Sequence, residues 1–193
     1  MRKMIAYEFL SIDGCFSGPE GHEMDFVTDT MDAANDADIA RQYEEIDAFV
    51  MGRTTYESLA GYWPHQTTAE EPLADYMNSI EKLVCASSTD TSKWNNSRLL
   101  EGDIPAAISK LKGQSGKDMM IIGSGTVVRS LTESDLIDEF RFLVFPTVLS
   151  GGKPLFDGLS QQQSLRKKRV LPFENGAIAI DYAVEQSQRS PSA

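Results

Sequence analysis

The sequence predicts an α/β protein with a largely parallel sheet that helices cover on both faces. Apolar runs of strand length alternate with segments that repeat apolar residues at helical spacing, and this alternation is typical of parallel sheets. Glycine-containing turns follow two of the runs. The expected strands are residues 3–10, 47–51, 82–87, 118–122, 139–146 and 176–184, and the expected helices are 33–45, 54–60, 72–80, 103–112 and 125–133.

The last third of the chain predicts a different ending for the sheet. The run at 139–146 is followed by a Gly151-Gly152 turn and then by two extended segments without a helical pattern between them. An antiparallel edge or hairpin is therefore expected. A chain of 193 residues without a repeat or linker fits one domain, residues 1–184. The tail at 185–193 has almost no apolar residue to anchor it and is expected to be frayed.

Composition limits the classes of partner. A formal charge of −11 opposes nucleic-acid binding, because phosphates would be repelled. Glu8 interrupts the first apolar run too early for a signal peptide, and no run reaches membrane-spanning length. Cys15 and Cys85 alone predict neither a disulfide framework nor a metal site. We expect a cytoplasmic protein whose partner is a small molecule.

The segment 119–128 contains the most informative turn. Its apolar run breaks into Gly123-Ser124-Gly125 before a helical pattern begins. Glycines let a phosphate approach the backbone closely, and the positive end of the following helix attracts its charge. The turn is predicted to form one half of a binding site for the phosphates of a dinucleotide. The alternative is that these glycines serve only the geometry of the turn.

A second phosphate-binding candidate follows the strand at 47–51. Gly52 stands at the turn, Arg53 supplies a planar permanent cation, and Thr54 begins a helical pattern. Two alternatives remain open. Thr54 or Thr55 could cap the helix, and Arg53 could form a surface salt bridge.

A third strand exit carries Ser87 and Ser88, after the run at 82–87. Because parallel strands end at the same edge of a sheet, the three exits should surround one phosphorylated ligand. The G-x-G-x-x-G fingerprint is absent, since Val128 occupies its third glycine position.

Six short motifs occur in an order that resembles a known family. They are Ser11-Ile12-Asp13-Gly14, the segment 51–57, Tyr62-Trp63-Pro64, Ile122-Gly123-Ser124-Gly125, the segment 136–141 and the segment 146–156. In this order they are similar to the dihydrofolate reductase-like proteins of the RibD C-terminal domain family, over residues 3–183. The resemblance implies a three-layer α/β/α sandwich on a mixed sheet, NADPH as cofactor and a homodimer.

The resemblance also implies where the cofactor would lie. Ile12 and Gly14 would lie beside the nicotinamide with Asp13 between them. The residues that would contact the phosphates and the adenosine are Gly52, Arg53, Thr54, Ser87, Ser88, Gly123, Ser124, Gly125 and Thr126.

The chemistry that follows is hydride transfer from NADPH to a small planar heterocycle such as a pterin, a folate or a pyrimidine. Asp25 and Asp13 are the candidate proton donors, although Asp13 also suits a simple turn. Trp63 could wall the substrate pocket or anchor its loop. Ile122 and Ser87 replace acidic residues usual in riboflavin-pathway reductases, which argues against a phosphoribosyl-aminopyrimidine substrate. The competing hypothesis is a non-catalytic nucleotide-binding or regulatory protein.

Overall fold

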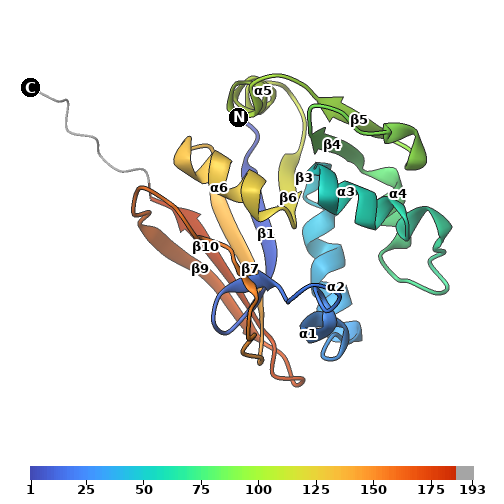
Figure 1. Ribbon diagram of the computed structural model, residues 1–193, viewed down its shortest axis with the longest axis vertical. Helices are drawn as coiled ribbons and strands as arrows, with labels where there is room; N and C mark the ends of the chain where they lie inside the picture. The colour runs from blue at the N-terminus through green and yellow to red at the C-terminus, as the bar shows by residue number, and fades with distance from the viewer. Residues whose placement is uncertain (186–193) are drawn as a thin grey trace, which may run out of the picture.

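The computed structural model describes residues 1–185 and contains an eight-stranded sheet (Figure 1). The strand order is β5-β4-β3-β6-β1-β7-β10-β9, and the first six of these strands run parallel. A separate two-stranded ribbon pairs β2 with β8. The strands are β1 Met4–Ser11, β2 Cys15–Ser17, β3 Ile46–Gly52, β4 Glu81–Cys85, β5 Ser97–Leu100, β6 Asp118–Ile122, β7 Glu139–Phe145, β8 Lys153–Pro154, β9 Leu165–Pro172 and β10 Ile178–Val184.

Helices cover both faces of the sheet, as the sequence predicts. On one face α5 and α6 pack over Met4 and Ala6 of β1, and on the other α2, α3 and α4 pack over Ile5 and Tyr7. This is the predicted three-layer α/β/α sandwich. The helices are α1 Asp25–Thr28, α2 Ala33–Tyr43, α3 Arg53–Ala60, α4 Ala74–Ser79, α5 Ile104–Lys112 and α6 Gly125–Glu133, with 3-10 turns at η1 Trp63–His65 and η2 Thr91–Lys93.

The antiparallel ending of the sheet is confirmed. β10 pairs antiparallel with both β7 and β9, so a hairpin closes this side. The predicted strands gave no bounds for β9, although an extended segment was expected there, and they did not include β5, β2 and β8, which have only two to four residues each. Such short strands carry too little alternation for a pattern to emerge. Of the predicted tail, only Glu185 lies among the described residues, and its N–H donates to the Ser164 carbonyl.

The topology decides which turns can meet. β4, β3, β6 and β1 are consecutive parallel neighbours, so their carboxyl ends form one continuous edge. We call this the strand-exit edge. Within residues 1–185, the structure contains no helix with the length and apolar character needed to span a membrane.

Candidate functional site

Two turns of the strand-exit edge are tied together by a serine side chain. The Gly52 N–H, after β3, donates to Ser124 Oγ, after β6, at 2.7 Å, and Ser124 Oγ donates to Thr55 Oγ1 at 2.6 Å. Gly123 and Ser124 adopt left-handed backbone conformations with φ of 59° and 68°. A Cβ at Gly123 would lie 3.0 Å from Thr55 Cγ2. The glycine therefore allows both the turn and the close approach of α3.

Both helices at this edge begin without a side-chain cap. Gly52 is the N-cap of α3 and Ser124 is the N-cap of α6, and neither cap side chain bonds a helix N–H. The alternative in which Thr54 or Thr55 caps α3 is wrong, because both residues lie inside its first turn and Gly52 is the N-cap. By contrast, Asp32 caps α2 through two backbone N–H groups. Two positive helix ends with free N–H groups thus stand side by side.

Arg53 contributes an unpaired cation to this edge. Its side chain is exposed, and within residues 1–185 no hydrogen bond or ion pair engages its guanidinium. The alternative of a surface salt bridge is therefore not found for Arg53 among the described residues. Thr54 and Thr126 are exposed in the first turns of α3 and α6, and Ser87 and Ser88 are exposed directly beyond β4. The structure brings the three predicted turns together, while ligand contact by their residues stays a prediction.

The exit of β1 lies on the same edge and carries an exposed apolar residue. Ile12 is 65% exposed, and its N–H donates to the Thr147 carbonyl at 2.9 Å. Asp13 accepts a hydrogen bond from the Leu149 N–H at 3.1 Å. Hydrogen bonding by the Ser11 side chain and by the Leu149 N–H holds the pKa of Asp13 below its usual value. This favours the carboxylate form, and Asp13 is thus poorly suited to donate a proton.

Gly14 completes the turn after β1. It has a φ of 77°, and its N–H donates to the Ser11 carbonyl at 3.0 Å. Asp13 therefore occupies the turn position that the sequence offered as the alternative to a catalytic role.

A cavity of about 340 Å³ adjoins this exit, since Thr147 and Leu149 also line it. Asp25 belongs to its wall, and Asp25 Oδ2 lies 2.6 Å from His22 Nδ1, with both side chains largely exposed. Among residues 1–185 no lysine or arginine lines the cavity, and the sequence has none between residues 4 and 40. The lining residues are Pro19, His22, Asp25, Phe26, Asp29, Thr30, Thr147, Leu149 and Ser150.

Trp63 is half-buried in η1. Its side chain packs edge-to-face on Tyr62 and against the core under α2 and α3, and its carbonyl accepts a hydrogen bond from Asn78 Nδ2. These contacts match the loop-anchor interpretation. Two further half-buried apolar residues, Phe9 and Met31, pack against the same core.

The sequence interpretation gave no role to Glu8, which is 2% exposed on β1. Its Oε1 has no hydrogen-bond partner among the described residues, and burial raises the pKa of this carboxyl well above its ordinary value. Glu8 therefore stays protonated at pH values at which exposed carboxyls are already charged. The sequence feature that could have identified Glu8 is a charged residue inside an apolar strand.

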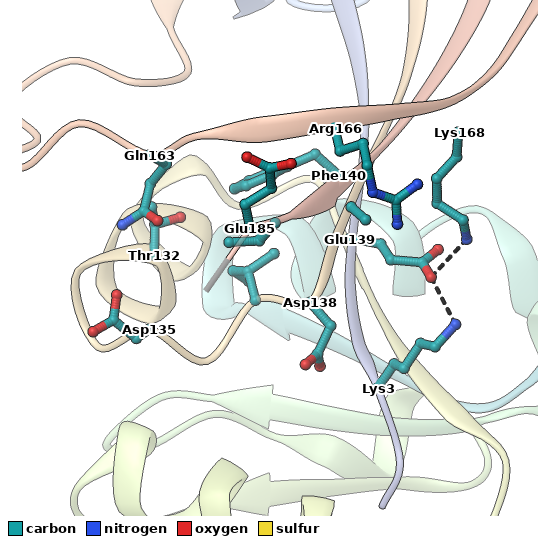
Figure 2. Close-up of a pocket in the computed structure, with 13 residues that line it drawn as sticks. Lys3, Thr132, Asp135, Asp138, Glu139, Phe140, Gln163, Arg166, Lys168 and Glu185 are labelled. Carbon is teal, nitrogen blue, oxygen red and sulfur yellow. Dashed lines mark hydrogen bonds and ion pairs between the residues drawn. The ribbon is translucent and has the colours of Figure 1, made fainter. Parts of the chain in front are cut away.

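A larger cavity, of about 580 Å³, lies at the amino-terminal ends of β1 and β7, on the side of the sheet opposite the strand-exit edge (Figure 2). Lys3 and Glu139 mark the starts of β1 and β7 there, and Arg166 and Lys168 come from β9. No sequence motif indicated this cavity, because its wall combines single residues from segments far apart in the chain.

The fold and the strand-exit edge define an α/β protein of the dihydrofolate reductase-like class. The chain matches the RibD C-terminal domain over residues 2–179, and it belongs to that family. It is 28% identical over 183 residues to "Uncharacterized protein YyaP" of Bacillus subtilis, covering 94% of each chain.

Solved structures agree on the fold. A "Putative riboflavin biosynthesis protein" from Shewanella sp. PV-4 superposes with a TM-score of 0.77 at 22% identity, covering 95% of this chain and 99% of that one. Dihydrofolate reductase from Enterococcus faecalis, complexed with NADP(H), superposes with a TM-score of 0.62 at 14% identity, covering 95% and 97%.

Proposed function

We propose that this protein is an NADPH-dependent reductase that transfers hydride to a small planar heterocycle of the pterin, folate or pyrimidine type. The observation that carries the proposal is the pair of uncapped helix starts at α3 and α6, held together by the Ser124–Gly52 hydrogen bond. Membership of a reductase-like family supports it.

The residues of the strand-exit edge fit a phosphorylated dinucleotide. The N–H groups that begin α3 and α6 would bind the pyrophosphate, and Arg53 would bind a further phosphate through its unpaired guanidinium. Ser87 and Ser88 would bond the adenosine side, and exposed Ile12 would pack on the nicotinamide. NADPH would supply the hydride, and the protein would bind the nicotinamide cofactor, orient it and shield it from water.

The electrostatics of the substrate side favour an acceptor without a phosphate group. Asp25 and Asp29 line the cavity beside β1, and no lysine or arginine in the described part of the chain lines it. A phosphate there would meet like charge without an arginine or lysine to balance it. This supports the sequence-based argument against a phosphoribosyl substrate, which rests on Ile122 and Ser87.

The presence of a proton donor distinguishes a reductase from a protein that only binds the nucleotide. Asp25 lines the substrate cavity but is exposed, and the pKa of Asp13 is lowered by its hydrogen bonds. The absence of a shielded acid at these two positions favours, as the second candidate, a nucleotide-binding protein without turnover. That candidate predicts NADPH binding with no oxidation in the presence of dihydropterin, dihydrofolate or pyrimidine substrates.

The decisive experiment is a titration of the purified chain with NADPH and with NADH, followed by nucleotide fluorescence and by thermal unfolding. Arg53→Gln should weaken NADPH binding about tenfold or more, because a charge-assisted contact contributes about 1.5–3 kcal/mol. Lys93→Gln, an exposed cation of η2, is the matched control. Equal affinity in wild type and a folded Arg53→Gln variant would contradict the phosphate assignment.

A further inference from the structure

The cavity of about 580 Å³ has three walls that meet only in the folded chain. The starts of β1 and β7 form one wall, the end of α6 forms a second, and the start of β9 with the end of β10 forms a third. Figure 2 shows Lys3, Lys168 and Arg166 toward one side of this cavity and Asp135 with Gln163 toward the other. We call it the β7-start cavity.

Glu139 organises the cationic side. This carboxylate is 3% exposed, and its Oε1 accepts hydrogen bonds from Lys3 Nζ and Lys168 Nζ, both at 2.7 Å. Its Oε2 accepts one from Arg141 Nη2 at 3.1 Å. Arg141 is also balanced by Glu45 at 2.9 Å. Lys3 and Lys168 therefore share the carboxylate of Glu139, and Asp118 adds a further negative charge near Lys3.

Arg166 adds a cation that has no ion-pair partner among the described residues. It comes from β9 and lines the cavity beside Lys168, yet no hydrogen bond or ion pair engages its guanidinium within residues 1–185. Besides Glu139, three further carboxylates line the cavity, those of Asp135, Asp138 and Glu185. Asp138 is bound by Lys112, and Glu185 forms no ion pair with Arg166 in this part of the chain.

Apolar residues close the space next to these cations. Ile137, Phe140, Ala183 and Val184 line the cavity together with the charged groups. Cavities of a few hundred Å³ that combine an apolar lining with a few fixed polar groups are the usual form of small-molecule sites. The arrangement suits a molecule with an anionic head and an apolar body.

We propose that the β7-start cavity is a second ligand site, which binds a small molecule through a carboxylate or phosphate group held by Arg166, Lys3 and Lys168. The site lies at the edge of the sheet opposite the strand exits, and it is independent of the proposed reductase function. An arginine fork with two neighbouring ammonium groups provides the geometry that such oxyanions need.

The test is isothermal titration of the full chain with benzoate and with phenyl phosphate, which share an anionic head and an apolar ring. We expect saturable binding of at least one, and the stronger one identifies the anionic group. Benzyl alcohol, with the ring but no charge, should bind at least tenfold more weakly. NADPH should not compete, because its proposed site lies at the other edge.

Two variants of neighbouring residues on β9 distinguish specific binding in the cavity from an effect of the overall charge of the protein. Arg166→Gln should weaken the anion about tenfold and leave the fold intact, since Arg166 has no partner in residues 1–185. Lys167→Gln removes the same charge from the neighbouring residue of β9, which does not line the cavity, and should leave binding unchanged. Absence of saturable binding by both probes, or an equal loss in the two variants, would overturn the proposal.

Discussion

Ser124 Oγ accepts the Gly52 N–H at 2.7 Å and so joins the turns that follow two neighbouring parallel strands. The same hydroxyl donates to Thr55 Oγ1 at the first turn of α3. One side chain thereby sets the spacing between the two uncapped helix starts. Its effect on a bound phosphate is positional, because its own hydrogen-bonding capacity is used within the protein.

Removal of this hydroxyl should therefore affect both stability and cofactor affinity. Ser124→Ala should lower the free energy of unfolding by about 1–3 kcal/mol, since the half-buried Gly52 N–H loses its acceptor. Ser124→Gly should be less destabilised, because glycine relieves a left-handed φ of 68°. Urea unfolding and NADPH titration check both variants. Unchanged NADPH affinity in the two would show that the spacing does not depend on Ser124.

Glu139 should make the protein acid-sensitive. Burial alone would raise the pKa of its carboxyl, but hydrogen bonds from Lys168, Lys3 and Arg141 together lower the pKa to about 2. The stabilisation is fully present above the ordinary carboxyl pKa near 4.5 and is lost as pH falls toward 2. It amounts to about 3 kcal/mol from the size of the shift.

Glu139→Gln should accordingly be less stable than wild type by about 3 kcal/mol at pH 7, and the difference should narrow below pH 4.5. Urea unfolding at pH 7 and pH 3 measures it. The exposed Glu101→Gln variant is the control. A difference that stays constant across this range would mean that ionisation of Glu139 does not stabilise the fold.

Glu8 should have the opposite pH dependence. Its pKa is raised by burial, so the folded chain holds a proton that the unfolded chain releases as pH rises past the ordinary carboxyl value. Stability should therefore be lost as pH increases. Glu8→Gln should match wild type near pH 4 and become relatively more stable toward pH 8. Parallel curves for the two proteins over that range would contradict a buried protonated carboxyl.

Asp25 can be tested as proton donor against a neighbour in the same cavity. Asp25→Asn should reduce turnover about 10²- to 10⁴-fold while NADPH affinity stays unchanged, because a general acid acts only in the chemical step. Asp29→Asn, which lines the same cavity, should have a much smaller effect. Single-turnover oxidation of NADPH measures both. An equal loss of turnover in the two variants would mean that the charge of the cavity, and not proton donation by Asp25, causes the effect.

The sequence by itself determined the layers of the fold. Alternating apolar runs and helical patterns predicted six of the strands and all the longer helices, because a buried strand and a helix face each leave a periodic pattern. Glycine-containing turns also predicted where β3 and β6 deliver the chain to α3 and α6. These signals are local, and neighbouring residues suffice to produce them.

Only the tertiary structure decided which residues meet. The order β4-β3-β6-β1 places the predicted turns at one edge, although β6 follows β3 by more than sixty residues in the chain. The uncapped start of α3, the burial of Glu8 and, within residues 1–185, the lack of an ion pair at Arg53 depend on tertiary contacts that no local pattern encodes. The β7-start cavity likewise exists because Lys3, Glu139 and Lys168 are brought together by strand pairing, and strand pairing is a long-range property.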